Sequence, residues 1–107
     1  MRESEIQRAV IAHWKALGLP DTLVAAIPNQ NAHGQYGLKR GLPDLICIGP
    51  RGVGFIELKR DKGRPTADQL EIKTLCLTRG VDHAITYGRE EPIRVLEEWG
   101  LVRRSQR

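Results

Sequence analysis

The sequence has little cysteine and no long apolar run. Its 107 residues include two cysteines, Cys47 and Cys76, and no Cys/His pair stands at metal-ligand spacing. A disulfide scaffold is therefore excluded, and zinc is disfavoured. No apolar run approaches the about 20 residues that a membrane span needs, and the N-terminal MRESEIQRAV has no signal-peptide hydrophobic region. We expect a cytoplasmic protein with no membrane partner.

Composition and charge are those of one globular domain. Hydrophobic residues make up 40% of the chain and charged residues 28%, which is not a disordered composition. Without a repeat or a linker, we expect a single domain over 1–107, with a flexible basic tail at 103–107 that adds nonspecific attraction to polyanions. The net charge of +4 favours a nucleic-acid partner only weakly, because many proteins of this size are as basic.

Apolar periodicity predicts an α/β domain. An apolar stripe over the first helix follows a capping box that pairs Ser4 with Gln7, and Thr66 with Gln69 repeats this spacing further on. The expected elements are a helix over 4–17, strands over 23–27, 44–49 and 54–59, a helix from Thr66 to Gly80, a strand over 84–87 and a helix over 91–102. This order, αβββαβα, gives a mixed central sheet flanked by helices.

The two central strands form a predicted hairpin. Residues 44–49 are apolar on both faces, which is typical of a strand covered on both sides. The connection at 50–53 is short enough to force antiparallel pairing. With Pro50 and Arg51 as the turn, Asp44 lies opposite Glu57, and a longer turn would shift this pairing by a residue or two.

Charged side chains interrupt this apolar hairpin. Asp44 and Glu57 are neighbours across the ladder, where like charges repel, so one carboxyl is protonated or a cation lies between them. A hard divalent ion such as Mg²⁺ fits best, and Lys59 on the same face is placed to orient a water or to neutralise phosphate charge. The alternative is a turn aspartate beside an exposed strand-face pair of Glu57 and Lys59.

Two polar segments are candidates for contacts with a nucleic acid. The glycine-rich stretch 29–41 has no periodicity and is either a functional loop or a solvated excursion. The link between the hairpin and the next helix is basic, and it is either a phosphate-steering segment or an ordinary solvated link. The candidate contact residues in the two segments are Asn29, Tyr36, Lys39, Arg40, Arg60, Lys62 and Arg64.

The ordered set of motifs resembles a nuclease family. Pro43-Asp44 followed by Glu57-Leu58-Lys59 matches the P-D…(D/E)-x-K signature of the restriction-endonuclease-like superfamily. More closely, the chain is similar to the virus-type replication-repair nuclease (VRR-NUC) domain. The similarity covers nearly the whole chain, and it includes the opening helix with Glu5, the Pro28-Asn29 segment, the Gly41-Leu-Pro-Asp44 entry, Phe55 to Lys59, and Gln69.

The resemblance implies a role for each matched residue. Asp44, Glu57 and the backbone carbonyl of Leu58 would bind the metal, and Lys59 would be the catalytic lysine. Gln69 would support the site from the second helix, although the N3 partner of Thr66 explains the same residue. Glu5 would reach the site from the first helix and assist catalysis or bind the metal; the alternative is a glutamate that suits the helix dipole.

The implied protein is a Mg²⁺- or Mn²⁺-dependent DNA endonuclease with a restriction-endonuclease-like core. The resemblance further implies a homodimer, similar to Holliday-junction resolvases, that acts on branched DNA in DNA repair. Its setting would be the cytoplasm of a bacterial or phage-infected cell. The alternative of another class is a non-catalytic DNA-binding or accessory module with an unused site.

Overall fold

The computed structural model describes residues 1–28 and 36–105. The elements along the chain are α1 (Glu3–Leu17), β1 (Leu23–Ala26), β2 (Leu45–Gly49), β3 (Gly52–Lys59), α2 (Ala67–Thr78), β4 (Asp82–Tyr87) and α3 (Glu90–Glu98). This is the expected αβββαβα order.

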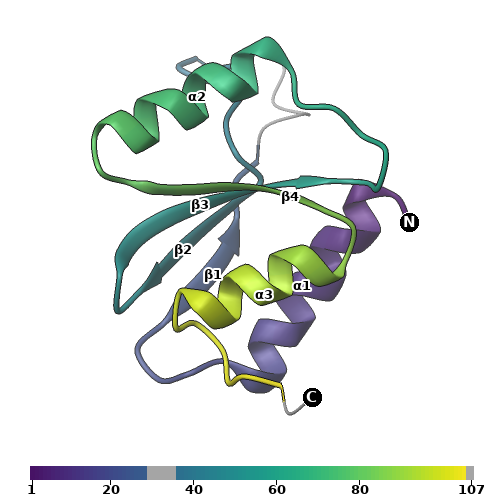
Figure 1. The fold of residues 1–107 in the computed structure, drawn as a ribbon, viewed down its shortest axis with the longest axis vertical. Helices are drawn as coiled ribbons and strands as arrows, with labels where there is room; N and C mark the ends of the chain where they lie inside the picture. Colours follow the sequence, from purple (N-terminus) through teal and green to yellow (C-terminus); the bar gives the residue numbers. More distant parts are fainter. Residues whose placement is uncertain (29–35, 106–107) are drawn as a thin grey trace.

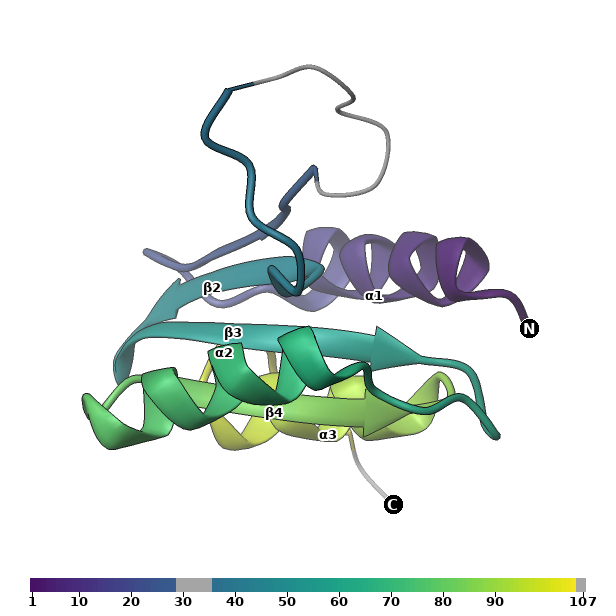
Figure 2. The same ribbon diagram turned by 90° about the horizontal axis from the view of Figure 1, so that it is seen from above.

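A four-stranded mixed sheet in the order β1-β2-β3-β4 forms the centre of the molecule. The first three strands pair antiparallel, and β4 pairs parallel to β3. The helix α2 makes the crossover between β3 and β4 and lies on one face of the sheet, whereas α1 and α3 lie on the other (Figures 1 and 2). The prediction of an α/β domain with helices on both faces is confirmed.

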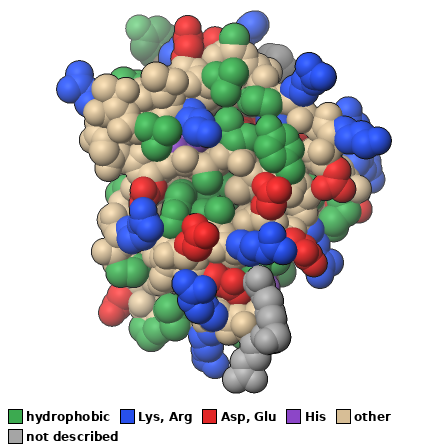
Figure 3. Space-filling model, in the orientation of Figure 1, with side chains coloured by type: hydrophobic (Ala, Val, Ile, Leu, Met, Phe, Trp, Pro, Cys, Tyr) green, Lys and Arg blue, Asp and Glu red, His purple; other side chains and the backbone are tan. Residues whose placement is uncertain are grey.

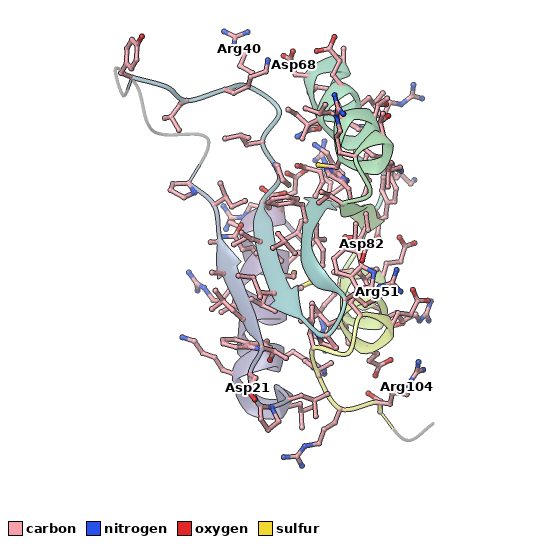
Figure 4. The ribbon with its side chains drawn as sticks, turned by 90° about the vertical axis from the view of Figure 1, so that its left-hand side faces the viewer. Asp21, Arg40, Arg51, Asp68, Asp82 and Arg104 are labelled. Carbon is pink, nitrogen blue, oxygen red and sulfur yellow. The ribbon has the colours of Figure 1, made fainter. Side chains whose placement is uncertain are left out.

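The hairpin has the predicted register. Gly49 pairs with Gly52 and Leu45 pairs with Ile56, so Pro50 and Arg51 form the two-residue turn. The turn is fixed to the neighbouring edge strand, because the Arg51 guanidinium donates two hydrogen bonds of 3.0 and 3.1 Å to the Asp82 carboxylate (Figure 4).

The hydrophobic core lies between the sheet and the pair α1 and α3. Alternate residues of the hairpin point into it, as strand geometry requires. Gly54 allows α3 to end close to the sheet, since a Cβ atom there would lie 2.7 Å from Trp99 Cζ3. The buried core comprises Ile6, Val10, Val24, Leu45, Cys47, Ile56, Leu58, Leu96, Trp99, Leu101 and Val102.

The opposite face of the sheet is only partly covered, and here the sequence prediction was wrong. Ile48 is 40% exposed, although its strand was expected to be covered on both faces. Its cross-strand partners Leu23 and Val53 are 40% and 44% exposed on the same face. The physical reason is that a single helix, α2, packs on this face and contacts β4 at the far side of the sheet.

Element ends differ from the prediction at several points. The helix α1 begins before Ser4, and Glu5 rather than Gln7 serves its N-terminus by accepting a 3.0 Å hydrogen bond from the Arg2 N–H. The last helix ends at Glu98 rather than at 102, because Gly100 has a positive φ of 73° and Val102 pairs as a β-bridge with Gly18.

The basic tail begins in contact with the domain. Its first residue, Arg103, donates from its backbone N–H to the Leu17 carbonyl at 3.0 Å, and the Ser105 N–H donates to Glu97 Oε2 at 2.8 Å. In the part of the chain that the structure describes, no helix is long and apolar enough to cross a membrane.

Candidate active site

Two carboxylates meet where β2 begins beside the end of β3. Leu45 and Ile56 are the last paired residues at the open end of the hairpin. Asp44 directly precedes Leu45, and its N–H donates to the Ile56 carbonyl at 3.1 Å. The Asp44 carboxylate turns back to β3, where Oδ2 accepts the Leu58 N–H at 2.7 Å. The predicted proximity of Asp44 and Glu57 is confirmed, and the negative charge of Asp44 helps to raise the pKa of Glu57.

These charged groups are buried. Asp44 is 9% exposed, Glu57 2% and Lys59 6%. The alternative of an exposed strand-face pair is therefore wrong. Lys59 Nζ lies 3.6 Å from Glu57 Oε2, so one buried cation faces two buried acidic side chains. Such an arrangement is unfavourable for folding unless something else satisfies it.

Without a cation, a proton offsets the repulsion. Burial, together with the negative charge of Asp44, raises the pKa of Glu57 from its ordinary 4.5 to about 8, although the charge of Lys59 opposes the shift. The raised pKa favours the protonated carboxyl of Glu57 near neutral pH, which is one of the two ways to relieve the repulsion between the carboxylates.

The same residues fit a hard divalent cation. Glu57 Oε1 is buried and has no hydrogen-bond partner among the described residues, which is rare for a buried carboxyl oxygen. Asp44, Glu57 and the Leu58 carbonyl offer only oxygen ligands, the type that Mg²⁺ prefers. Within residues 1–28 and 36–105, no group of three or more His, Cys, Asp or Glu side chains could hold a metal. The donor set therefore suits an ion that keeps several waters.

Gln69 joins α2 to the acidic pair, and its predicted capping role is confirmed. Its side-chain Nε2 donates to Glu57 Oε2 at 2.8 Å. Its Oε1 accepts the Thr66 N–H at 2.9 Å, and its own N–H donates to Thr66 Oγ1 at 3.1 Å, which completes the predicted capping box. One residue thus caps the start of α2 and contacts Glu57.

Glu5 does not join the acidic pair in the structure. Its side chain is 50% exposed, and Oε1 accepts hydrogen bonds from the backbone N–H and the Nε of Arg2. These bonds lower the pKa of Glu5. The explanation as a helix-start glutamate accounts for all of its described contacts, and the expected place in the site is not observed.

Exposed basic side chains flank the site in sequence, as predicted. The described candidates on the two segments are all exposed: Tyr36, Lys39, Arg40, Arg60, Lys62 and Arg64. Blue Lys and Arg side chains are visible along the right-hand edge of the molecule in Figure 3. Arg40 projects at the same end of the molecule as Asp68 on the first turn of α2 (Figure 4). Asn29 lies outside the described residues.

The structure adds one neighbour that the sequence did not indicate. Tyr87 pairs with Lys59 in the parallel ladder, so its half-buried side chain lies beside Lys59 on the same face. Alternation along 82–87 hints at the face, but the register of a parallel crossover depends on how α2 packs. Local sequence therefore did not identify Tyr87.

The mixed sheet with helices on both faces defines an α/β domain that carries a buried acidic pair. No family model and no curated protein matches the chain. Among solved structures, it is similar to a VRR-NUC domain protein, with 24% identity, a TM-score of 0.79, and coverage of 92% of this chain and 88% of the other. A second VRR-NUC domain matches with 24% identity and a TM-score of 0.67, over 91% and 96% of the two chains. The fold that the sequence resemblance implied is confirmed.

Proposed function

We propose that this protein is a metal-dependent nuclease that hydrolyses DNA phosphodiester bonds. One observation carries the proposal: the Asp44–Glu57 pair is buried beside Lys59, and Glu57 Oε1 has no hydrogen-bond partner among the described residues. A pair that exists only for stability would be better replaced by apolar side chains. The VRR-NUC fold supports the same class of activity.

Asp44, Glu57 and the Leu58 carbonyl would hold Mg²⁺ or Mn²⁺. When bound, such an ion polarises a phosphoryl oxygen and lowers the pKa of a coordinated water. The Leu58 N–H holds Asp44 Oδ2 in place. Lys59 keeps its ammonium on the site side of β3, where it orients a water or stabilises the charge that develops on the phosphate.

The exposed basic residues would bind the DNA backbone. Lys39 and Arg40 on one side and the residues of the β3–α2 link on the other supply phosphate contacts that carry no sequence information. Asn29 and Tyr36 would add contacts from the long loop. A homodimer would present two sites to the two strands of a branched DNA such as a Holliday junction, in the cytoplasm of a bacterial or phage-infected cell.

The decisive experiment compares the wild type with Asp44→Asn on labelled four-way junction, flap and linear duplex DNA, with Mg²⁺, Mn²⁺ or EDTA. The exposed Asp21→Asn is the matched control, because it removes one acidic charge near the turn of the hairpin, at the end opposite to Asp44, and Asn tolerates the positive φ of 59° there. We expect metal-dependent cleavage by the wild type and by Asp21→Asn, and none by Asp44→Asn. DNA binding without a product under any condition would refute the nuclease and favour the non-catalytic module.

A further inference from the structure

The orientation of the Gln69 amide is fixed by the N-terminus of α2. Its oxygen accepts the Thr66 N–H at 2.9 Å, and its backbone N–H donates to Thr66 Oγ1 at 3.1 Å. A flipped amide would place its NH₂ against the Thr66 N–H and lose that bond. Thr66 therefore holds the Gln69 NH₂ toward Glu57.

The two oxygens of Glu57 are made unequal by this contact. Oε2 accepts the Gln69 Nε2–H at 2.8 Å and lies 3.6 Å from the Lys59 ammonium. Oε1 is buried and has no hydrogen-bond partner in the described part of the chain. Oε2 is therefore engaged by protein groups, whereas Oε1 is free to bind a ligand.

Asp44 is restricted in a similar way. Its Oδ2 accepts the Leu58 N–H at 2.7 Å, and the backbone of β3 cannot withdraw that donor without breaking the strand. Each carboxylate thus has one oxygen engaged by a fixed N–H group from the protein.

We propose that Gln69, oriented by Thr66, determines the cation specificity of the site by keeping Glu57 to one coordinating oxygen. Ca²⁺ takes six to eight oxygens and commonly uses bidentate carboxylates, whereas Mg²⁺ and Mn²⁺ accept single carboxylate oxygens and retain waters. A Glu57 restricted to Oε1 favours the smaller ions over Ca²⁺. The inference rests on the proposed metal-dependent function and adds to it the residue that selects the ion.

The test measures the binding of Mn²⁺ and of Ca²⁺ to the chelator-treated protein by calorimetry, and the Ca²⁺ concentration that halves Mn²⁺-dependent cleavage. Gln69→Leu removes the donor, and Gln69→Met replaces it if the first variant does not fold. Thr66→Ser keeps both bonds of the capping box. Glu91→Ala is the matched control, because it removes a comparable 2.9 Å bond at the start of α3, from the Tyr87 N–H to Glu91 Oε1.

We expect Gln69→Leu to lower the Mn²⁺ affinity about tenfold, as the loss of a hydrogen bond to a metal ligand commonly does. The Ca²⁺ affinity should fall less or rise, because Oε2 becomes available, so the preference for Mn²⁺ narrows and Ca²⁺ inhibits at lower concentration. Thr66→Ser and Glu91→Ala should keep the wild-type preference.

An unchanged preference in the Gln69 variants would overturn the inference, whether both affinities stay constant or fall together, because a purely structural cap predicts that result. If the wild type binds Mn²⁺ and cleaves DNA, that outcome leaves the proposed nuclease intact. If the wild type neither binds Mn²⁺ nor cleaves DNA with any cation, the nuclease and the inference both fail.

Discussion

Replacing Glu57 by glutamine should change how stability depends on pH. In the metal-free protein, burial and Asp44 raise the pKa of Glu57 from 4.5 to about 8. The native state therefore holds a proton that the unfolded chain has released between these two values, and stability falls as pH rises through this window. At 1.36 kcal/mol for each pKa unit, the gap corresponds to a loss of about 5 kcal/mol, a large share of the about 5–15 kcal/mol that stabilises a small domain.

Urea unfolding between pH 5 and pH 9 in EDTA measures this effect. The stability of the wild type relative to Glu57→Gln should fall across the range, with most of the fall complete above about pH 8, because glutamine does not titrate. Titrations elsewhere in the chain occur in both proteins and cancel in the difference. Excess Mn²⁺ should restore stability at high pH in the wild type alone, since binding to the native state adds RT ln(1 + [L]/Kd).

A parallel pH dependence in the two proteins would refute this reasoning, because it would mean that Glu57 ionises in the folded protein as easily as in the unfolded chain. The Glu57→Gln substitution should not disturb the contact with Gln69. The Glu57→Gln side chain can still accept from Gln69 Nε2 through its carbonyl oxygen, so that contact is retained.

Three further predictions concern other groups. Lys59→Met should reduce single-turnover cleavage at least about a hundredfold while the Mn²⁺ affinity by calorimetry changes little; unchanged cleavage would exclude Lys59 from the chemistry. Gly41→Ala should destabilise the protein by about 1–3 kcal/mol more than Gly37→Ala in urea unfolding, because both have positive φ but only Gly41 would place a Cβ 2.5 Å from the Asp68 backbone; equal losses would contradict a tight contact. Burial, aided by the charge of Lys73, lowers the pKa of His83 from 6.5 to about 4, so the stability of the wild type relative to His83→Phe should fall by about 3 kcal/mol as pH falls between these values, measured by urea unfolding from pH 7 to pH 4.

The hairpin and its acidic pair were predictable because their determinants are local. A two-residue turn at Pro50 and Arg51 fixes the register of both strands, and this register brings Asp44 to Glu57. The spacing of Thr66 and Gln69 likewise fixed the start of α2. The same spacing predicted the capping contact of Gln69, which is confirmed. Gln69 also donates a hydrogen bond to Glu57, and a role in the site stays a prediction.

The parts that were not predicted depend on contacts between distant segments. The apolar residues of β2 indicated cover on both faces, but cover depends on how many helices pack on each face, and only α2 packs beside Ile48. The neighbour of Lys59, Tyr87, is set by the register of a parallel crossover. Glu5 was predicted at the site by resemblance, whereas its contacts are with Arg2 at the start of its own helix.

The alternation along β3 places core residues on one face of the strand and charged residues on the other. Ile56 and Leu58 belong to the core beside α1 and α3, while Glu57 and Lys59, which alternate with them, point to the opposite face of the sheet, where Gln69 of α2 contacts Glu57. Substitutions on the α2 side can therefore alter the charged groups without opening a cavity in the core. This makes the domain a suitable scaffold for redesign, in which the face that carries Glu57 and Lys59 is varied while the packing that folds the chain stays constant.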